Sequence, residues 1–183
     1  MCVMKDSVVQ MGALVLRDIA KPVAKQEFGT KELAATLKKM QKLVAAEEFG
    51  VAIAAPQIGV SKRIFILADK AFDATVPPDK IATAKKIFIN PEIIRLSRKK
   101  YEMAEGCLSV RGKYGTVIRH EKASVRACDQ DGHVFVYHAT GLIAQIFQHE
   151  YDHLDGILYV DKAEKLRNEK ESAQLKKEIS KEK

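Results

Sequence analysis

The sequence has few cysteines and no long hydrophobic run, and both absences exclude classes of protein. Only three of its residues are cysteines. An odd and small number does not form a disulfide framework and is typical of a reducing compartment, where a lone thiol can serve as a metal ligand or a nucleophile. No apolar stretch approaches the roughly 20 residues that span a bilayer, and Met1–Asp6 lacks the apolar core of a secretory signal. These features predict a cytoplasmic protein without a membrane partner.

The composition is that of one folded domain with an excess of positive charge. Of the 183 residues, 46% are hydrophobic and 30% are charged, which is typical of a globular protein rather than a disordered one. The formal net charge of +7 favours polyanions in general. Because no zinc-finger or RNP-type motif accompanies this charge, specific DNA or RNA recognition is not expected.

Two segments have the periodicity of helices. The apolar residues between Leu33 and Val44 recur at spacings of four, three and four, which predicts a helix over residues 31–48 with Thr30 as its N-cap. Residues 141–154 form a second, more apolar segment that directly follows Thr140. This second helix is expected to be buried at the centre of the fold.

Short β-branched and aromatic segments predict strands. The proline- and charge-containing residues 68–86 are interpreted as a surface loop. We therefore expect an α+β fold, with mainly antiparallel short strands around the central helix and a charged helix at the C-terminus. The predicted strands cover residues 51–55, 63–67, 87–90, 93–96, 116–119, 123–128 and 134–137.

The strongest chemical signal lies on the second predicted helix, where residues 148–153 read QHEYDH. Residues four apart lie on one face of a helix, so His149 and His153 can bind one metal ion with Glu150 beside it. Two histidines and a glutamate are costly in a buried helix unless a partner satisfies them. The central helix is therefore predicted to be metal-binding. The alternative is a pair of hydrogen-bonded core histidines at a chance spacing.

A catalytic metal site needs a third protein ligand and an open position. Cys107 is the better candidate, because it lies in the turn-capable segment 105–109 and because a thiolate binds zinc or ferrous iron well. Taken alone, such a cysteine is more often an inert buried thiol. Two other patterns are weaker: Tyr159 stands where one protease class has its third histidine, and Glu164 and Glu169 lie in the charged tail.

A third segment, residues 50–59, is rich in small residues and contains Gln57 after an apolar strand and a proline. Small residues allow a backbone or a substrate to approach closely. On its own, Gln57 is equally consistent with a surface turn.

Together these segments resemble the three motifs of the peptide deformylase family. They read GVAIAAPQ at 50–57, EGCLS at 105–109 and QHEYDHLDG at 148–156, in the family's order, and the resemblance runs from about Val8 to Asp161. It implies a metal-dependent hydrolase that removes the N-formyl group from the first methionine of newly made polypeptides. The implied partners are N-formyl-methionyl nascent peptides and, further, the ribosome.

The resemblance also implies a metal site. Cys107, His149 and His153 would hold one divalent ion, with Fe(II) expected in the cell and Zn(II) or Ni(II) possible in purified protein. The open position would hold a water that attacks the formyl carbon. Cys107 would then be a ligand rather than a nucleophile.

Roles for other residues follow from the same resemblance. Glu150 would be the general base and acid. Gln57, with the backbone N–H of Leu108, would bind the developing oxyanion. Apolar residues would form the pocket for the methionine side chain. The implied substrate-binding residues are Val51, Ala52, Ile53, Gly106, Leu142 and Ile146.

The sequence departs from the family at three positions. Ala52 replaces the usual glycine and Ile53 the usual leucine, and Arg111 stands where many relatives have proline. The first change could narrow the groove that receives the peptide, and the last alters the loop beside the site. We also predict a buried ion pair between Glu105, in the metal loop, and Arg119 on the next strand.

Two other functions use the same features. A metallopeptidase that cuts internal bonds also has the H-E-x-x-H pattern, but lacks a role for Cys107. A catalytically silent, ribosome-associated homologue would not need Glu150.

The domain organisation follows from a change of composition at residue 161. Residues 1–160 are expected to form the catalytic domain, and residues 161–183 a solvated, charged tail that is helical, with Leu175 and Ile179 as an apolar pair. We expect the tail to be dispensable for chemistry, while its lysines suit RNA phosphates.

Overall fold

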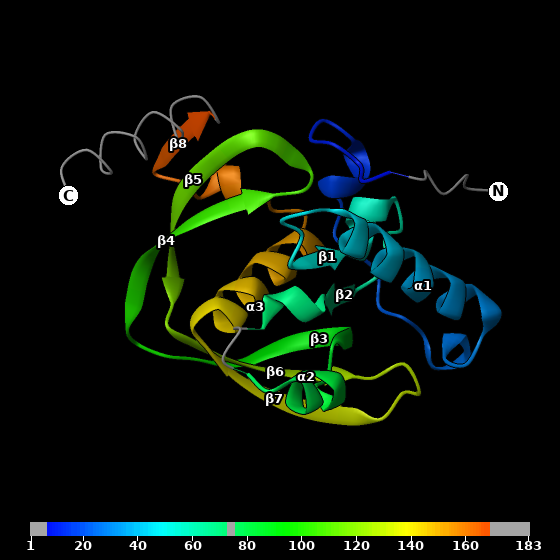
Figure 1. Ribbon diagram of the computed structural model, residues 1–183. Helices are drawn as coiled ribbons and strands as arrows, with labels where there is room; N and C mark the ends of the chain where they lie inside the picture. Colours follow the sequence, from blue (N-terminus) through cyan, green and yellow to red (C-terminus); the bar gives the residue numbers. More distant parts are fainter. Residues whose placement is uncertain (1–6, 73–75, 169–183) are drawn as a thin grey trace.

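The computed structural model describes residues 7–72 and 76–168, which form an α+β fold with two antiparallel sheets (Figure 1). The larger sheet has five strands in the spatial order β1-β2-β3-β6-β7, and the smaller has three in the order β4-β5-β8. The fold class predicted from the sequence is confirmed. The five strands are β1 (Ala52–Ala54), β2 (Ile64–Leu67), β3 (Ile87–Leu96), β6 (Lys122–Cys128) and β7 (Val134–Thr140).

Strand β3 joins two segments that the sequence analysis treats as separate strands. Its register with β6 shifts between Ile89 and Glu92, and Asn90 has a φ of 49°. The Asn90 side chain accepts a hydrogen bond from the Val23 amide and donates one to the Val23 carbonyl, at 2.8 Å each. A β-bulge therefore accommodates Pro91 inside the sheet.

The smaller sheet consists of β4 (Lys100–Cys107), β5 (Val110–His120) and β8 (Lys165–Asn168). Strand β4 is missing from the predicted strands, because its first half is polar and charged and has no apolar run. It is held by its long hairpin pairing with β5, from Lys100 opposite His120 to Cys107 opposite Val110. The hairpin carries Cys107 at the turn end of β4.

Two helices match the predicted ones. Helix α1 (Lys31–Ala46) buries the predicted apolar stripe, and the Thr30 hydroxyl accepts a hydrogen bond from the Leu33 amide at 3.2 Å. Helix α3 (Gly141–Leu154) follows Thr140, although that side chain makes no capping hydrogen bond. A short helix α2 (Pro78–Thr83) lies in the segment predicted to be a loop. Single 3-10 turns complete the fold: η1 (Leu14–Leu16), η2 (Lys25–Glu27), η3 (Ala55–Ile58), η4 (Asp69–Ala71) and η5 (Tyr159–Asp161).

Helix α3 crosses the middle of the molecule between the two sheets, and α1 covers the opposite face of the larger sheet (Figure 1). Successive side chains of a strand point to opposite faces. Phe65 of β2 therefore packs with Phe147 of α3, whereas Ile64 and Ile66 pack with the stripe of α1. The central helix is thus buried, as predicted, and its polar face is directed at the smaller sheet.

The described part of the tail departs from the predicted C-terminal helix. Residues 165–168 form β8, which pairs with β5 between Lys113 and Thr116. Gly115 makes this close approach possible, because an added Cβ would lie 3.1 Å from the Leu166 side chain of β8 and 2.8 Å from the Ala163 side chain just before it. The helix prediction is wrong for these residues, since the edge of β5 offers backbone partners that a sequence pattern cannot reveal. Met1–Asp6 and residues 169–183, with Leu175 and Ile179, lie outside the described residues.

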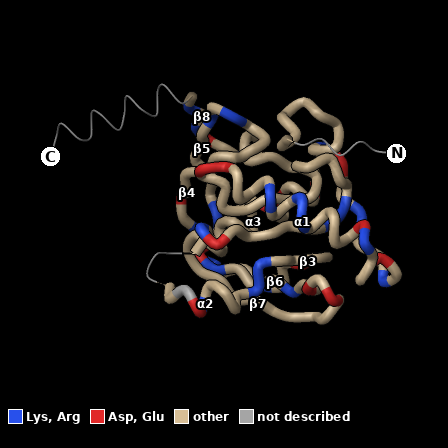
Figure 2. Tube along the Cα trace, turned by 45° about the vertical axis from the view of Figure 1, so that its right-hand side comes forward, with Lys and Arg blue, Asp and Glu red and all other residues tan. Residues whose placement is uncertain are grey.

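In the view of Figure 2, basic and acidic positions are both scattered along the chain. No helix in the described ranges has the length and apolarity needed to cross a membrane.

Gly156 closes the C-terminal end of α3 against the N-terminal segment. Its φ is +73°, and a Cβ there would lie 2.4 Å from the Arg17 carbonyl oxygen. Gly29 has nearly the same φ, +76°, but a Cβ there meets nothing within 4 Å. An alanine at Gly29 would therefore cause backbone strain alone, whereas an alanine at Gly156 would cause both backbone strain and steric overlap.

We predict that Gly156→Ala lowers the free energy of unfolding by about 3–4 kcal/mol, and Gly29→Ala by about 1 kcal/mol. Only the first variant combines the left-handed backbone with a clash against a backbone atom. Urea unfolding of both variants at one pH measures the difference. Equal losses in the two variants would show that the contact with Arg17 relaxes freely.

Candidate metal centre and active-site cavity

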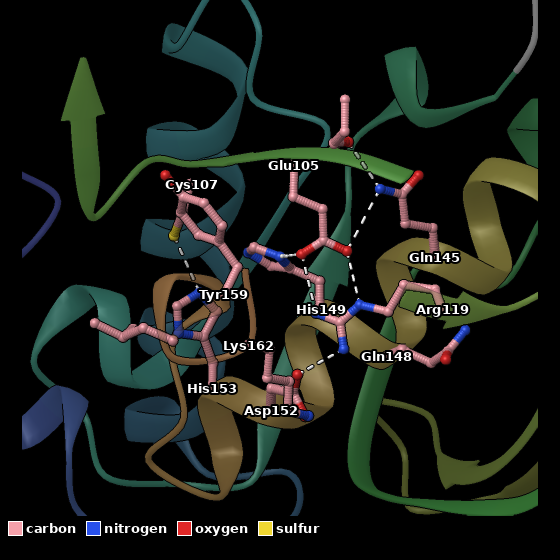
Figure 3. Close-up of polar contacts among 12 residues, drawn as sticks. Glu105, Cys107, Arg119, Gln145, Gln148, His149, Asp152, His153, Tyr159 and Lys162 are labelled. Carbon is pink, nitrogen blue, oxygen red and sulfur yellow. Dashed lines mark hydrogen bonds and ion pairs between the residues drawn. The ribbon is translucent and has the colours of Figure 1, made fainter. Parts of the chain in front are cut away.

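Three predicted ligand residues come together between α3 and the β4–β5 hairpin (Figure 3). His149 and His153 are one turn apart on α3, and their ring centroids are 5.0 Å from each other. The Cys107 sulfur lies 3.1 Å from His153 Nε2. Potential donor atoms of all three residues lie within 4.8 Å of one another. The i,i+4 spacing and the hairpin thus form one cluster from distant segments.

A buried carboxylate orients the first histidine. Glu105 Oε2 accepts a hydrogen bond from His149 Nδ1 at 2.8 Å. This contact favours the proton on Nδ1 and leaves the Nε2 lone pair for a metal, as the carboxylate partners of metal-binding histidines commonly do.

The predicted ion pair between Glu105 and Arg119 is confirmed. Arg119 donates to both Glu105 oxygens, at 2.7 and 2.9 Å, and its third contact is with Asp152 at 2.7 Å (Figure 3). Lys162 also donates to Asp152, at 2.6 Å. Asp152 and Lys162 were not singled out from the sequence, because only the fold reveals that they face Arg119.

The polar side chains of the cluster strongly influence one another's protonation. Burial raises the pKa of the Cys107 thiol, but His153 and His149 outweigh it and lower this pKa to about 5. Burial lowers the pKa of His149, but the Cys107 and Glu105 contacts raise it well above its ordinary value. Similarly, Arg119 and His149 overcome burial and lower the pKa of Glu105 to about 2. The cysteine is therefore a thiolate at neutral pH.

These residues fit a divalent metal. A thiolate and two imidazoles suit zinc or ferrous iron, and three protein ligands leave a position open. Glu150, next to His149 on α3, is buried, and its Oε2 has no hydrogen-bond partner within the described ranges. Burial raises the pKa of Glu150 to about 7. Buried polar atoms normally have a hydrogen-bond partner. Because no protein group in the described part of the chain fills this role for Glu150 Oε2, this oxygen can accept a hydrogen bond from a water or a substrate beside the donor cluster.

The other positions considered from the sequence, as far as the structure describes them, do not belong to the donor cluster. Tyr159 stacks on the His149 ring, with centroids 6.1 Å apart, and donates its hydroxyl proton to the Lys113 carbonyl at 2.8 Å. It therefore supports His149 and the hairpin, a role that the sequence pattern did not indicate. Glu164 is exposed and does not belong to the donor cluster, and Glu169 is outside the described residues.

Gln57 reaches the cluster from η3, and its amide is oriented by the backbone. Its Oε1 accepts a hydrogen bond from the Ala54 amide at 2.8 Å, so the NH₂ group points the other way. Nε2 then lies 3.4 Å from the Cys107 sulfur and 3.2 Å from Ser109 Oγ. The turn-residue alternative is wrong, because Gln57 is buried.

Gln148 positions α3 against the hairpin. Its Oε1 accepts from the His120 amide and its Nε2 donates to the His120 carbonyl, both at 2.9 Å. The side chain thus pairs with a residue of β5 as a neighbouring strand would. The sequence places Gln148 in the motif but does not reveal this partner.

A cavity of about 530 Å³ opens beside the cluster. Gln57, Cys107, Leu108, His149 and Glu150 contribute to its wall. His153 lies behind the wall and is fully buried. Five of the six predicted substrate-binding residues also line the cavity, namely Val51, Ala52, Gly106, Leu142 and Ile146.

The exception is Ile53, and its prediction as a substrate-binding residue is wrong. Side chains alternate along β1, so Ala52 and Ala54 face α3 while Ile53 faces α1. Ile53 is completely buried among the residues that pack on the α1 stripe. It supports β1 from behind and does not line the cavity.

The chain is similar in sequence to a known protein family and to several of its members. The family model described as "Polypeptide deformylase" matches residues 5–169. A peptide deformylase of Carboxydothermus hydrogenoformans is 38% identical over 162 residues, covering 87% of this chain and 93% of its own. One of Symbiobacterium thermophilum is 42% identical over 160 residues, covering 87% and 67%.

Among solved structures, a class I type b peptide deformylase of Acinetobacter baumannii with Met-Ala-Ser bound has a TM-score of 0.73 and 36% identity, covering 85% of this chain and 97% of that one. The structure of a Thermotoga maritima peptide deformylase has the same TM-score with 30% identity, covering 86% and 97%.

We predict that Glu105→Gln lowers the free energy of unfolding by about 3 kcal/mol at pH 7, because it leaves Arg119 partly unpaired. The pKa of Glu105 falls from 4.5 to about 2 on folding. Its stabilisation is therefore fully present above about pH 4.5 and is lost as the pH falls towards 2.

Denaturant unfolding between pH 2 and pH 7 measures this effect. The difference between wild type and Glu105→Gln should shrink as the pH falls through this window. Glu92→Gln is the matched control, because its 2.6 Å ion pair with Arg126 is exposed. A difference independent of pH would contradict the assignment.

Proposed function

The chain belongs to the polypeptide deformylase family, and we propose that Cys107, His149 and His153 hold the divalent metal on which its activity depends. This activity is removal of the N-formyl group from the methionine that begins a new polypeptide. The observation that carries the ligand assignment is the convergence of a thiolate and two imidazoles within 4.8 Å of one another beside the cavity, with Cys107 and His149 in its wall.

The ion would supply Lewis acidity and would make water a stronger nucleophile at neutral pH. We propose ferrous iron as the cellular metal, with zinc or nickel as substitutes in purified protein. A ligand set of one soft thiolate and two imidazoles supports this choice. Glu105 supports it indirectly, because its hydrogen bond keeps His149 in the orientation and tautomer that a ligand requires.

Glu150 is the proposed general base and acid. Its unpartnered Oε2 and its place in the cavity wall allow contact with an attacking water. Burial raises its pKa to about 7, which suits a group that must both take and return a proton near neutral pH. Glu150 accepts the proton of the water and passes it to the leaving amine.

Gln57 Nε2 and the backbone N–H of Leu108 are the proposed donors to the developing oxyanion. The Ala54 amide fixes the Gln57 side chain so that its NH₂ group faces the cysteine side of the cavity. Preorganised donors of this kind need no reorganisation during the reaction, and the loss of one typically costs about 2.7–4 kcal/mol.

The methionine side chain is proposed to occupy the apolar part of the cavity, between Val51, Leu142 and Ile146. Ala52 and Gly106 border the same space, and their small size leaves room for a substrate. A formyl carbon carries only hydrogen, so the donors can close on its oxygen. An acetyl methyl group would push the carbonyl away, and displacement of about 1 Å can lower a rate roughly 100-fold.

We place the reaction in the cytoplasm, on nascent N-formyl-methionyl peptides. The free Cys107 thiol supports a reducing compartment, where it stays available as a ligand. The net charge of +7 supports an association with ribosomal RNA. The solved relative with Met-Ala-Ser bound supports a peptide as the ligand of the cavity.

We predict that purified protein contains about one equivalent of divalent metal, as three-ligand catalytic sites do. Cys107→Ala should hold much less, because the thiolate ligand is lost. Elemental analysis after desalting measures the content. Cys128→Ala is the control, since Cys128 packs beside the α1 core instead of the cavity. Unchanged metal content in Cys107→Ala would contradict the ligand assignment.

The test of the function is hydrolysis of formyl-Met-Ala-Ser by metal-loaded protein. Glu150→Gln should retain the metal and the fold but lose about 10²–10⁴-fold in kcat/KM, because Gln cannot accept a proton. Glu164→Gln, at an exposed position, should leave the activity unchanged.

Acetyl-Met-Ala-Ser provides the specificity control. The wild type should cleave it at least about 100-fold more slowly than the formyl peptide. Equal rates on the two peptides, or wild-type turnover by Glu150→Gln, would overturn the proposed mechanism.

A further inference from the structure

Two charged segments face each other across the mouth of the cavity. One is the acidic rim, residues 47–50, which follows α1. The other is the basic rim, residues 111–114, at the start of β5 after the hairpin turn. Both line the cavity, and Figure 1 shows the hairpin turn next to the C-terminal end of α1. Arg111 Nη2 joins the rims by contacting Glu47 Oε1 at 2.6 Å.

Each rim is also held by its own contacts. Lys70 donates to the Glu47 carbonyl and, at 3.4 Å, to the Glu48 carbonyl, which fixes the acidic rim at the end of α1. Tyr159 donates to the Lys113 carbonyl at 2.8 Å and fixes the basic rim. The positions of the rims therefore do not depend only on the ion pair between Arg111 and Glu47. A charged group of a substrate can contact this pair without displacing either rim.

Arg111 is better placed than Glu47 to take that partner. The Arg111 side chain is 62% exposed and the Glu47 side chain 28%. Within the described ranges the guanidinium gives only its Nη2 group to Glu47, although a guanidinium has five N–H donors. A second carboxylate can bind the remaining donors without displacing Glu47. An incoming ammonium group would instead share Glu47 and approach both Arg111 and Lys113.

The charges of the substrate determine how the difference in exposure between Arg111 and Glu47 affects binding. A formylated N-terminus carries no charge, so the first charges that a new polypeptide brings to the mouth are those of its early side chains. An extended chain advances by about 3.3 Å per residue. With the methionine side chain in the apolar part of the cavity, we place the residues after it between the two rims.

We propose that Arg111 is a specificity-determining residue that favours peptides with Asp or Glu in the two positions after the methionine. Glu47 orients the guanidinium, and Lys113 adds positive charge on the same rim. This inference rests on the proposed function, since it assumes that the peptide leaves the cavity through this mouth.

The experiment measures kcat/KM at low salt for C-terminally amidated peptides, which lack a terminal carboxylate. Formyl-Met-Ala-Ser is compared with versions carrying Glu or Lys at the second or third position. For wild type, Glu at one of these positions should raise kcat/KM about threefold over Ala, a size typical of an exposed charge pair, and Lys should lower it. Salt at 1 M should remove the preference, because it screens exposed charges.

The variants identify the residue responsible. Arg111→Gln should turn over the Ala peptide but lose the preference for Glu, and Arg111→Lys should keep part of it. Glu47→Gln should keep part of the preference, because Arg111 keeps its charge but loses the carboxylate that orients it. Arg126→Gln is the matched control: it removes an exposed 2.6 Å ion pair, with Glu92, that lies away from the cavity.

A preference that persists in Arg111→Gln, or a wild type that treats Glu, Ala and Lys alike, would overturn the proposal. Calorimetric binding of the amidated product peptides Met-Ala-Ser and Met-Glu-Ser gives the same comparison without turnover. Loss of activity on every formyl peptide would therefore refute the proposed function alone, while the binding ratio would still decide the role of Arg111.

Discussion

The buried Glu105 carboxylate is the interaction on which the arrangement of the site depends. It receives two hydrogen bonds from Arg119 and one from His149. These residues come from β4, β5 and α3, so one carboxylate joins the hairpin to the central helix. A buried carboxylate without such partners would be protonated or would destabilise the fold. The same contacts that make Glu105 tolerable therefore also set the orientation of a metal ligand.

Two glutamates in this site show how environment divides chemical roles. Burial raises the pKa of both, but Arg119 and His149 reverse the effect on Glu105 and bring its pKa to about 2. Glu150 has no comparable donor on its Oε2, and its pKa rises to about 7. Glu105 thus remains a fixed negative charge that orients His149. Glu150, one residue further along α3, is left able to exchange a proton with a substrate.

The β4–β5 hairpin serves both ends of the cavity. At the inner end it supplies Cys107, and at the mouth it supplies the basic rim with Arg111. Its long pairing, the Gln148 contacts with His120 and the Tyr159 contact with Lys113 hold it against the rest of the fold. Strand β8 covers its outer edge. A change in the mouth can therefore alter substrate preference while the ligands stay in place.

The sequence by itself determined the elements whose signals are local. Both helices and two of the ligand residues could be predicted, because their signals are short sequence patterns. These are the apolar stripe of α1, the apolar character of α3 and the i,i+4 spacing of His149 and His153. The pairing of Glu105 with Arg119 could be inferred because Glu105 lies in the metal loop and Arg119 on the next predicted strand. Long-range contacts decided the rest of the fold and of the site.

Strand β4 has no apolar pattern and forms because β5 provides its hydrogen-bonding partners. Residues 165–168 become a strand for the same reason. Ile53 points away from the cavity because the pleat of β1 directs it towards α1. The partners of Gln148, Tyr159, Asp152 and Arg111 lie 10 to 64 residues away in the chain, and only the packed structure brings such groups within hydrogen-bonding distance.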